Sequence, residues 1–311
     1  MAQQQTPIIF IMGPTASGKT GLAVDLRKQL NGDIISVDSA LVYRGMDIGT
    51  AKPDADTLKE APHRLINLCD PSKNYDAAQF RTDALREIKD IHKAGKLPLL
   101  VGGTGLYFRA LEKGLAPLPT ANNEVRQQLL QEAQQLGWLA LHQRLNKIDP
   151  VAAKKIHPND TQRIQRALEV FMLTGKPISD LQQTQQHVLP YPVIKIILSP
   201  PREVLLQRIE QRFDQMLAQG LMAEVKTLFQ RDDLTATHPA MRSVGYRQVW
   251  QYLSGELNQT QMRERAIIAT RQLAKRQLTW LRAETNAQWF DSLQTDLYQS
   301  VVNYVETRLK N

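Results

Sequence analysis

The sequence Ile8-Ile9-Phe10-Ile11-Met12 is followed directly by Gly13-Pro14-Thr15-Ala16-Ser17-Gly18-Lys19-Thr20. The first five residues are all apolar, which predicts a buried strand. The next eight match the pattern G-x-x-x-x-G-K-[ST], and the spacing after them predicts a helix from Lys19 to Leu30. A strand, this loop and a helix in that order predict a P-loop, in which backbone N–H groups and the lysine surround phosphate oxygens. The stretch therefore predicts an α/β protein that binds a di- or triphosphate.

Short apolar runs alternate with helical patterns around this stretch. Strands are predicted at Asp33–Val37, Leu97–Val101 and Val193–Leu198, and a helix at Asp76–Ala94, where Asp76 and Gln79 fit a capping box. No strand-like run occurs between 120 and 191, and from Arg202 to the end the pattern is helical. The expected fold is a P-loop-type parallel sheet core flanked by helices, with an inserted all-helical domain. We assign 1–119 and 192–311 to the core and 120–191 to the insert.

Composition narrows the class of protein. The chain has 311 residues with a net charge of +8 and one cysteine, Cys69. A single cysteine excludes an internal disulfide and a cysteine-rich zinc site. The positive charge indicates either a polyanionic partner or a solvated Lys/Arg surface. No apolar run approaches the roughly 20 residues of a membrane span, and the start lacks the features of a signal peptide. We expect a cytoplasmic protein with no membrane contact, and a monomer, because no extended apolar helix face is unassigned.

Polar residues follow two predicted strands. Asp38-Ser39 follows one and Gly102-Gly103-Thr104 the other, and in a parallel sheet both should face the P-loop. Asp38 could be a general base, a Mg²⁺ ligand or a turn or cap residue. The two glycines could admit a ligand or only form a tight turn. An NTP-hydrolysing site would show a strand ending in Asp before a catalytic Glu or Gln, which is absent here, so phosphate binding without ATP turnover is favoured.

Basic residues gather at three further places. The segment Arg263–Arg282 is the most basic, and Arg271, Lys275 and Arg282 lie along the edge of its apolar stripe, whereas Arg276 points away from it. Such a row could line a channel for a polyanion or lie in solvent. The same two interpretations apply to the pair Arg163 and Arg166. Arg208 and Arg212, after the strand Val193–Leu198, could reach a pyrophosphate or pair with Glu210 or Asp214.

Six ordered blocks together resemble the tRNA dimethylallyltransferase (tRNA isopentenyltransferase) family, over nearly the whole chain. They are Gly13–Thr20, Ile35–Ser39 with Val42–Pro53, Val101–Tyr107, His157–Asp160 with Gln162–Glu169, Val244–Arg247, and Thr270–Arg282. One departure is Leu41, where many members carry Gln. If that position helps to hold the target base, its hydrogen bond is lost or moved here.

The resemblance implies transfer of a dimethylallyl group from dimethylallyl diphosphate to the exocyclic amine of the adenosine 3′ of the tRNA anticodon. The P-loop would then hold the diphosphate, and ATP binding is indicated by the motif only. Implied catalytic residues are Asp38 as general base, Thr104 and Lys19, and Mg²⁺ is the implied cofactor, with Thr20 as its ligand. Implied diphosphate ligands are Gly13, Thr15, Ala16, Ser17, Gly18, Lys19, Thr20 and Arg212.

The resemblance also implies that the insert holds the tRNA anticodon stem-loop and that the target base is flipped out of its stack. Implied tRNA-binding residues are Asp38, Ser39, Ala40, Leu41, Thr104, Arg126, Gln162, Arg163, Ile164, Gln165, Arg166, Arg242, Ser243, Val244, Gly245, Tyr246, Arg247, Lys275, Arg276, Gln277, Leu278, Thr279, Trp280, Leu281 and Arg282. Two rival functions are a P-loop kinase of small metabolites and a non-catalytic RNA-binding module that senses a nucleotide.

Overall fold

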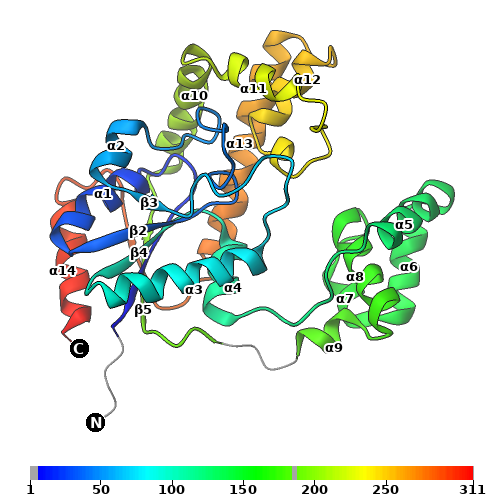
Figure 1. Cartoon of the computed structure of the whole chain (residues 1–311), viewed down its shortest axis with the longest axis horizontal. Helices are drawn as coiled ribbons and strands as arrows, with labels where there is room; N and C mark the ends of the chain where they lie inside the picture. The colour runs from blue at the N-terminus through cyan, green and yellow to red at the C-terminus, as the bar shows by residue number, and fades with distance from the viewer. Residues whose placement is uncertain (1–5, 184–187, 311) are drawn as a thin grey trace. The chain divides into compact units, whose positions relative to one another are not determined.

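The computed structural model describes residues 6–183 and 188–310 (Figure 1). It divides into two compact units, one formed by residues 1–112 with 190–311 and the other by residues 113–189. The smaller unit therefore includes the connecting segment 113–119, which the sequence analysis gave to the core. Each unit is described by itself below.

The larger unit is built on a six-stranded parallel sheet of order β3-β2-β4-β1-β5-β6. The strands are β1 (Ile8–Met12), β2 (Gly32–Val37), β3 (His63–Arg64), β4 (Leu97–Gly102), β5 (Val193–Leu198) and β6 (Ala287–Phe290). The residues of β1 are all buried, because this strand lies between β4 and β5 with helices on both faces. The expected α/β class with a parallel sheet is confirmed.

Helices cover both faces of this sheet. On one face α1 (Lys19–Gln29) and α14 (Leu297–Leu309) pack on Ile9, Ile11 and Ile34. On the other face lie α3 (Ala77–Lys93) and α4 (Gly105–Lys113), and Phe108 of α4 contacts Phe10 with ring centroids 4.9 Å apart. The predicted capping box of α3 is present, since Asp76 accepts from the amide of Gln79 and Gln79 accepts in return. The carboxyl ends of the strands are left for the loops that form the candidate site.

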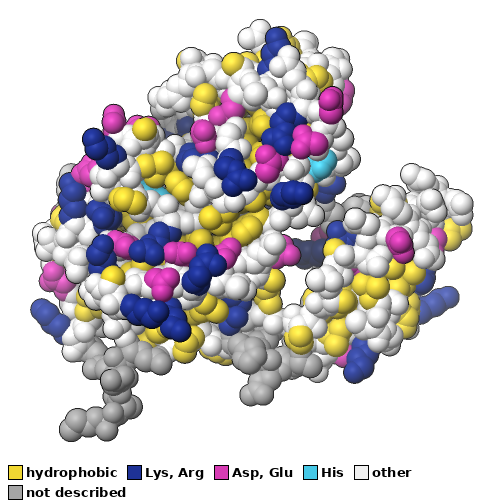
Figure 2. Space-filling view, viewed as in Figure 1, with side chains coloured by type: hydrophobic (Ala, Val, Ile, Leu, Met, Phe, Trp, Pro, Cys, Tyr) yellow, Lys and Arg dark blue, Asp and Glu magenta, His cyan; other side chains and the backbone are white. Residues whose placement is uncertain are grey.

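A second hydrophobic core forms beyond those strand ends, where helices from the last third of the chain pack together with the segment 42–48. These elements are α10 (Arg202–Ala218), α11 (Leu221–Phe229), a 3-10 turn at Ala240–Arg242, α12 (Tyr246–Leu253) and α13 (Gln259–Leu281), while α2 (Ala55–Glu60) precedes β3. Tyr43 and Met46 are buried in this core, so it anchors the loop that follows β2. Basic and acidic side chains are interspersed on the visible surface of these helices (Figure 2).

The smaller unit is helical in its described part. It contains α5 (Asn123–Leu136), α6 (Trp138–Ile148), α7 (Pro150–Lys155), α8 (Thr161–Thr174) and α9 (Ile178–Gln182). Asp160 caps α8 by accepting from the amide of Arg163, and Gly175 ends it in the left-handed conformation. Ile164 and Leu168 of α8 are buried in the core of this unit.

Two strands were missed by the sequence analysis. β3 has only two residues, and β6 has four, of which two are exposed, at the edge of the sheet. Neither is long enough to show the periodicity from which strands are predicted. The expectation of an entirely helical pattern after Arg202 is therefore wrong at Ala287–Phe290.

Candidate active site

The loop 13–20 joins the central strand β1 to the start of α1. Ala16 and Gly18 adopt left-handed conformations, with φ of 62° and 90°. Alternating backbone hands turn successive N–H groups toward one concave side, which is the geometry that binds anions. The buried hydroxyl of Ser17 has no hydrogen-bond partner within the described residues. The loop therefore presents backbone and side-chain donors at the positive end of a helix.

Two basic side chains converge beside this loop. Lys19 of α1 donates from Nζ to the carbonyl of Pro14 at 3.1 Å, and Arg212 reaches the same place from α10. Burial lowers the pKa of Lys19 to about 8, although Asp38 opposes the shift, and the charge of Arg212 lowers it further. Burial also lowers the pKa of Arg212. Burial disfavours the charged forms of both side chains, and each charge also disfavours the other. A polyvalent anion bound between them would therefore be stabilised.

The ends of β2 and β4 bring Asp38, Ser39 and Thr104 together, as expected. Asp38 accepts from the amide of Ala40 at 2.8 Å and from that of Leu41 at 3.4 Å through the same oxygen, Oδ1. This is a turn and not a helix cap, and it leaves Oδ2 without a recorded partner among the described residues. The amide of Ser39 donates to the hydroxyl of Thr104 at 3.2 Å. The hydroxyl of Thr104 accepts there, so its own proton is available to a ligand.

Lys19, Arg212, Asp38, Ser39 and Thr104 line one cavity of about 520 Å³, together with Thr15, Ala16 and Thr20, whereas Gly13, Ser17 and Gly18 are not among its lining residues. Four basic side chains contribute to it, Lys19, Arg212, Arg242 and Arg276, and Asp38 is the one carboxylate among its lining residues in the described chain. Its apolar lining includes Ala51, Phe213, Met216 and Trp280. The cavity therefore combines an anion-binding end, one base and an apolar surface.

Gln277 connects two loops of the cavity. From α13 its Oε1 accepts from the amide of Thr15 at 2.8 Å, and its Nε2 donates to the carbonyl of Gly103 at 2.9 Å. A Cβ on Gly103 would lie 2.4 Å from that Nε2, and one on Gly102 would lie 2.0 Å from the carbonyl oxygen of Val37. The glycines are thus required by close packing of the chain on itself, and both also line the cavity, so this packing does not exclude the approach of a ligand.

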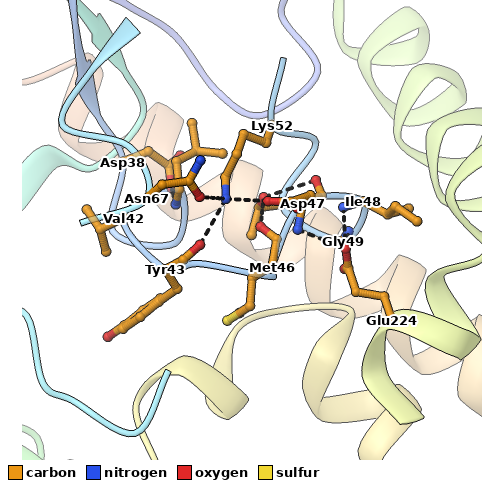
Figure 3. Close-up of polar contacts among 12 residues, drawn as sticks. Asp38, Val42, Tyr43, Met46, Asp47, Ile48, Gly49, Lys52, Asn67 and Glu224 are labelled. Atoms are coloured by element: carbon orange, nitrogen blue, oxygen red, sulfur yellow. Dashed lines mark hydrogen bonds and ion pairs between the residues drawn. The ribbon is translucent and has the colours of Figure 1, made fainter. Parts of the chain in front are cut away.

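Another side of the cavity is formed by the loop after β2, which Figure 3 shows. Glu224 of α11 accepts from the amides of Asp47, Ile48 and Gly49 at 2.8, 2.8 and 3.1 Å, and from the hydroxyl of Tyr246 at 2.5 Å. Lys52, almost fully buried, donates to the carbonyl of Tyr43 and to the side chains of Asp47 and Asn67.

The residues that follow in this loop, among them Gly49, Thr50, Ala51 and Pro53, line the cavity. Sequence reasoning gave no role to Glu224 or Lys52. The only signal was that Lys52 lies within the block Val42–Pro53, and no local pattern marks Glu224 as the partner of that block.

The sequence-predicted tRNA-binding residues of the larger unit fall into three groups. Those that line the cavity are Asp38, Ser39, Ala40, Leu41, Thr104, Arg242, Ser243, Val244, Gly245, Arg276, Gln277 and Trp280. Those exposed elsewhere are Arg247, Lys275, Thr279 and Arg282. Tyr246 and Leu281 are fully buried, and Leu278 packs in a small apolar cluster with Leu205 and Ile209. Side-chain contact of Tyr246 and Leu281 with RNA is therefore excluded in this structure.

The predicted orientation of the basic residues on α13 needs correction. Arg276 lines the cavity, whereas Arg271 contacts Glu210 at 3.1 Å, and Glu210 and Asp214 both contact Arg263. The apolar stripe used for the prediction omitted Gln277, whose polar side chain is buried. The face toward the cavity instead carries Thr270, Leu273, Arg276, Gln277 and Trp280, at helical spacing. Arg208 lies apart from this cavity and contacts Ser292.

Only some of the predicted RNA-binding residues of the smaller unit are free to contact a ligand. Glu169 is fully buried and accepts from Arg126 at 2.9 Å, from Arg166 at 2.7 Å and from the amide of Asn122. Burial would raise the pKa of Glu169, but hydrogen bonds from Arg166 and Arg126 outweigh it and hold the pKa below its usual value.

The remaining predicted residues of this unit divide in the same way. Gln165 donates to the carbonyl of Arg126, and Ile164 is fully buried, which excludes RNA contact by its side chain. Gln162 and Arg163 are exposed. Arg163 contacts Asp160, yet 72% of its side chain remains accessible.

The donor set suits a magnesium ion held largely by its ligand. Within the described residues no group of three His, Cys, Asp or Glu side chains could hold a metal. Thr20 and Asp38 supply one hydroxyl and one carboxylate to the cavity. Mg²⁺ is commonly held by one or two carboxylates together with substrate phosphates and water, so the residues fit an ion that arrives with a diphosphate.

No helix of the described chain has both the length and the apolarity to cross a membrane.

The fold and the site together define a class, that of α/β proteins in which a glycine-rich loop after the first strand faces a basic cavity. A model of the IPP transferase family matches residues 41–284. The full-length tRNA isopentenylpyrophosphate transferase of Bacillus halodurans is 39% identical over 98% of this chain and 97% of its own, with a TM-score of 0.74.

Two further solved structures are similar over almost the whole chain. The tRNA delta(2)-isopentenylpyrophosphate transferase of Staphylococcus epidermidis is 34% identical over 97% of this chain and 99% of its own, with a TM-score of 0.69. A eukaryotic dimethylallyltransferase acting on tRNA is 29% identical over 97% of this chain and 78% of its own, with a TM-score of 0.79. The chain belongs to the tRNA isopentenylpyrophosphate transferase family, whose members are tRNA dimethylallyltransferases, and it is an enzyme of that kind.

Proposed function

We propose that this enzyme transfers the dimethylallyl group of dimethylallyl diphosphate to the exocyclic N6 amine of the adenosine 3′ of the tRNA anticodon, with release of diphosphate. The observation that carries the proposal is the composition of the cavity. Lys19 and Arg212 face the 13–20 loop, and Asp38 and Thr104 line the same space together with an apolar surface. The cavity can thus bind an anionic group and an apolar group side by side, next to the carboxylate of Asp38.

The leaving group is placed at the basic end of the cavity. As the bond between the allylic carbon and the diphosphate oxygen breaks, negative charge grows on that oxygen. Lys19, Arg212 and the N–H groups of the 13–20 loop other than that of Thr15, which donates to Gln277, stabilise this charge because they are fixed before the reaction begins. A Mg²⁺ ion held by Thr20 and the diphosphate would add a further positive charge to the leaving group.

The acceptor amine is placed at the ends of β2 and β4. Its nitrogen forms a bond to the allylic carbon, and its surplus proton passes to Oδ2 of Asp38, the oxygen that the turn does not use. The hydroxyl of Thr104 orients the amine or the diphosphate from the neighbouring strand end. General-base catalysis of this kind contributes about 10²–10⁴-fold to a rate.

In this proposal only the target base enters the cavity, and exposed residues hold the rest of the tRNA. The exposed cations Arg242, Arg247, Lys275, Arg276 and Arg282 of the larger unit, with Gln162 and Arg163 of the smaller unit, would contact the anticodon stem-loop. The target base leaves its stack to enter the cavity, which costs least in a single-stranded loop.

Mass spectrometry of tRNA incubated with the protein, dimethylallyl diphosphate and Mg²⁺ tests the proposal. We expect a five-carbon mass gain on the adenosine 3′ of the anticodon. ATP consumption with unmodified tRNA would instead support a kinase. Binding of tRNA without modification of any base would support a non-catalytic RNA-binding module.

A further inference from the structure

Gln277 lies at the contact between the loop that follows β1 and the loop that follows β4. Its side chain is buried, and both of its polar atoms are used, one by the amide of Thr15 and the other by the carbonyl of Gly103. Each contact spans more than half of the chain, since Thr15 and Gly103 precede Gln277 by 262 and 174 positions. The sheet pairs the two strands only as far as Met12 and Gly102, and this one amide group links the two loops beyond that last pair.

The two loops carry opposite sides of the reaction proposed above. Thr15 belongs to the 13–20 loop, on which the diphosphate would lie, and its amide already has an acceptor in Gln277 and is not free for a phosphate oxygen. Gly103 immediately precedes Thr104, which lies beside Asp38 at the acceptor end. The relative position of the loops sets the separation between the leaving diphosphate and the attacking amine, to which transfer rates are highly sensitive.

The close packing around Gln277 makes this arrangement specific. Gly103 approaches so near that a Cβ would meet Nε2 at 2.4 Å, and the same Cβ would lie 3.1 Å from the carbonyl oxygen of Gly13. A side chain on Gly103 would displace Gln277 or separate the loops. An apolar residue at 277 would remove the acceptor of the part-buried Thr15 amide and leave the buried Gly103 carbonyl without this donor.

We propose that Gln277 is a positioning residue for the transfer reaction, which holds the diphosphate-binding loop in register with the strand end that carries Thr104. Its side chain does not contact RNA, although it lies in a segment whose neighbours Lys275 and Arg276 are exposed. This inference rests on the proposed function and adds a residue to it.

The test compares Gln277→Met, which keeps the side-chain length but removes both hydrogen bonds, with Gln277→Glu, which keeps an acceptor for the Thr15 amide only. Gln272→Met is the matched control, because Gln272 is an exposed glutamine on the same helix. We expect Gln277→Met to lower kcat by about 10²-fold, the effect of a misplacement near 1 Å. Gln277→Glu should retain part of the rate, and the KM for tRNA should stay within about twofold in both.

A second measurement does not depend on turnover. Titration with inorganic diphosphate should show weaker binding to Gln277→Met than to the wild type and to Gln272→Met, while the salt dependence of tRNA binding stays the same in all three. Loss of tRNA affinity with a normal chemical step would overturn the inference and make Gln277 an RNA contact. Equal rates in Gln277→Met and Gln272→Met would also overturn it. A wild-type protein that modifies no tRNA would refute the proposed function instead.

Discussion

Asp38 carries two duties with its two carboxylate oxygens. Oδ1 accepts from the amides of Ala40 and Leu41, and Oδ2 of this cavity-lining residue is the proposed base. The turn needs only an acceptor, which an asparagine also supplies, whereas the reaction needs a proton acceptor. A single substitution therefore separates the two duties.

Asp38→Asn should lower the single-turnover rate by about 10²-fold or more and leave the affinities for donor and tRNA little changed. The thermal melt should stay close to that of the wild type, because the turn keeps its acceptor. Rates measured across a Mg²⁺ titration distinguish the alternatives. Recovery of the rate at high Mg²⁺ would assign Asp38 to the metal and not to the amine proton.

The lowered pKa of Lys19 predicts a pH dependence of diphosphate binding. With a pKa near 8, Lys19 in the free protein loses its proton as the pH rises through that value. Bound diphosphate favours the charged ammonium, so binding above this pH must take up a proton. Affinity for inorganic diphosphate should then fall by up to about tenfold per pH unit above about pH 8.

Calorimetry across this pH range measures the effect directly. Lys19→Ala is the control, since it should bind diphosphate more weakly and lack the part of the pH dependence that Lys19 supplies, while its tRNA affinity stays nearly intact. An identical pH profile in wild type and Lys19→Ala would show that Lys19 does not titrate with the ligand.

At the scale of elements, helix α8 carries two arginines with different tasks. Arg163 is largely exposed, whereas Arg166 donates to the buried Glu169 and to the carbonyl of Pro119. Arg163→Ala should therefore flatten the plot of log tRNA affinity against log salt by about 0.7–0.9, the contribution of one phosphate.

Arg166→Ala should act mainly on folding. It leaves Glu169 with one fewer donor and should lower the free energy of unfolding by about 1–3 kcal/mol. Thermal melts of the two variants, beside salt titrations of tRNA binding, separate these effects. If Arg163→Ala leaves the slope unaltered, that side chain is only part of a solvated surface.

The loop at residues 47–49 depends on helix α11 through Glu224. Glu224→Gln replaces one acceptor oxygen by an N–H₂ group among donors, so the loop should loosen at a cost of about 1–3 kcal/mol of stability. We also expect a higher KM for dimethylallyl diphosphate, because the following residues line the cavity. Glu203→Gln, on an exposed glutamate of the neighbouring helix α10, is the matched control. Indistinguishable melts and KM values in the two variants would refute this role.

The sequence predicted those features that depend on residues close together in the chain, and it missed those that depend on distant residues. The 13–20 loop, β1, α3 with its capping box and the meeting of Asp38 with Thr104 follow from short contiguous patterns. Gln277 and Glu224 act through partners more than 170 positions away, which no such pattern reveals. Tyr246 is an example of the same limit, since its place in a matching block gave no sign that it is buried against Glu224.

For the whole molecule, the basic side chains behind the net charge of +8 are not equally available to a polyanion. Many arginines are paired with carboxylates, as Arg263 is with Asp214. Arg242, Arg247, Lys275, Arg276 and Arg282 have no recorded ion pair with another described residue. These five and the exposed Arg163, and not the total charge, should set the response of tRNA binding to salt.

If each of these six side chains neutralises one phosphate of a single-stranded loop, log tRNA affinity should fall against log salt with a slope of about −4. Reversing the charge of one of them, as in Lys275→Glu, should make the slope less steep by at least the contribution of one phosphate, about 0.7. Fluorescence anisotropy with labelled anticodon stem-loop measures it. A slope near zero would place the RNA on another surface or show that contacts other than phosphate dominate.

The position of β1 at the centre of the sheet has a consequence for the synthesis of the protein. One edge of β1 pairs with β4, but the other pairs with β5, where Ile8 lies opposite Val193. A ribosome adds about 5–20 residues per second, so the partner strand emerges roughly 10–40 seconds after β1. During that time a fully apolar strand has at least one open edge, and two until β4 has emerged, and an open edge is a template for aggregation. The nascent chain should therefore depend on chaperones most strongly before β5 leaves the ribosome.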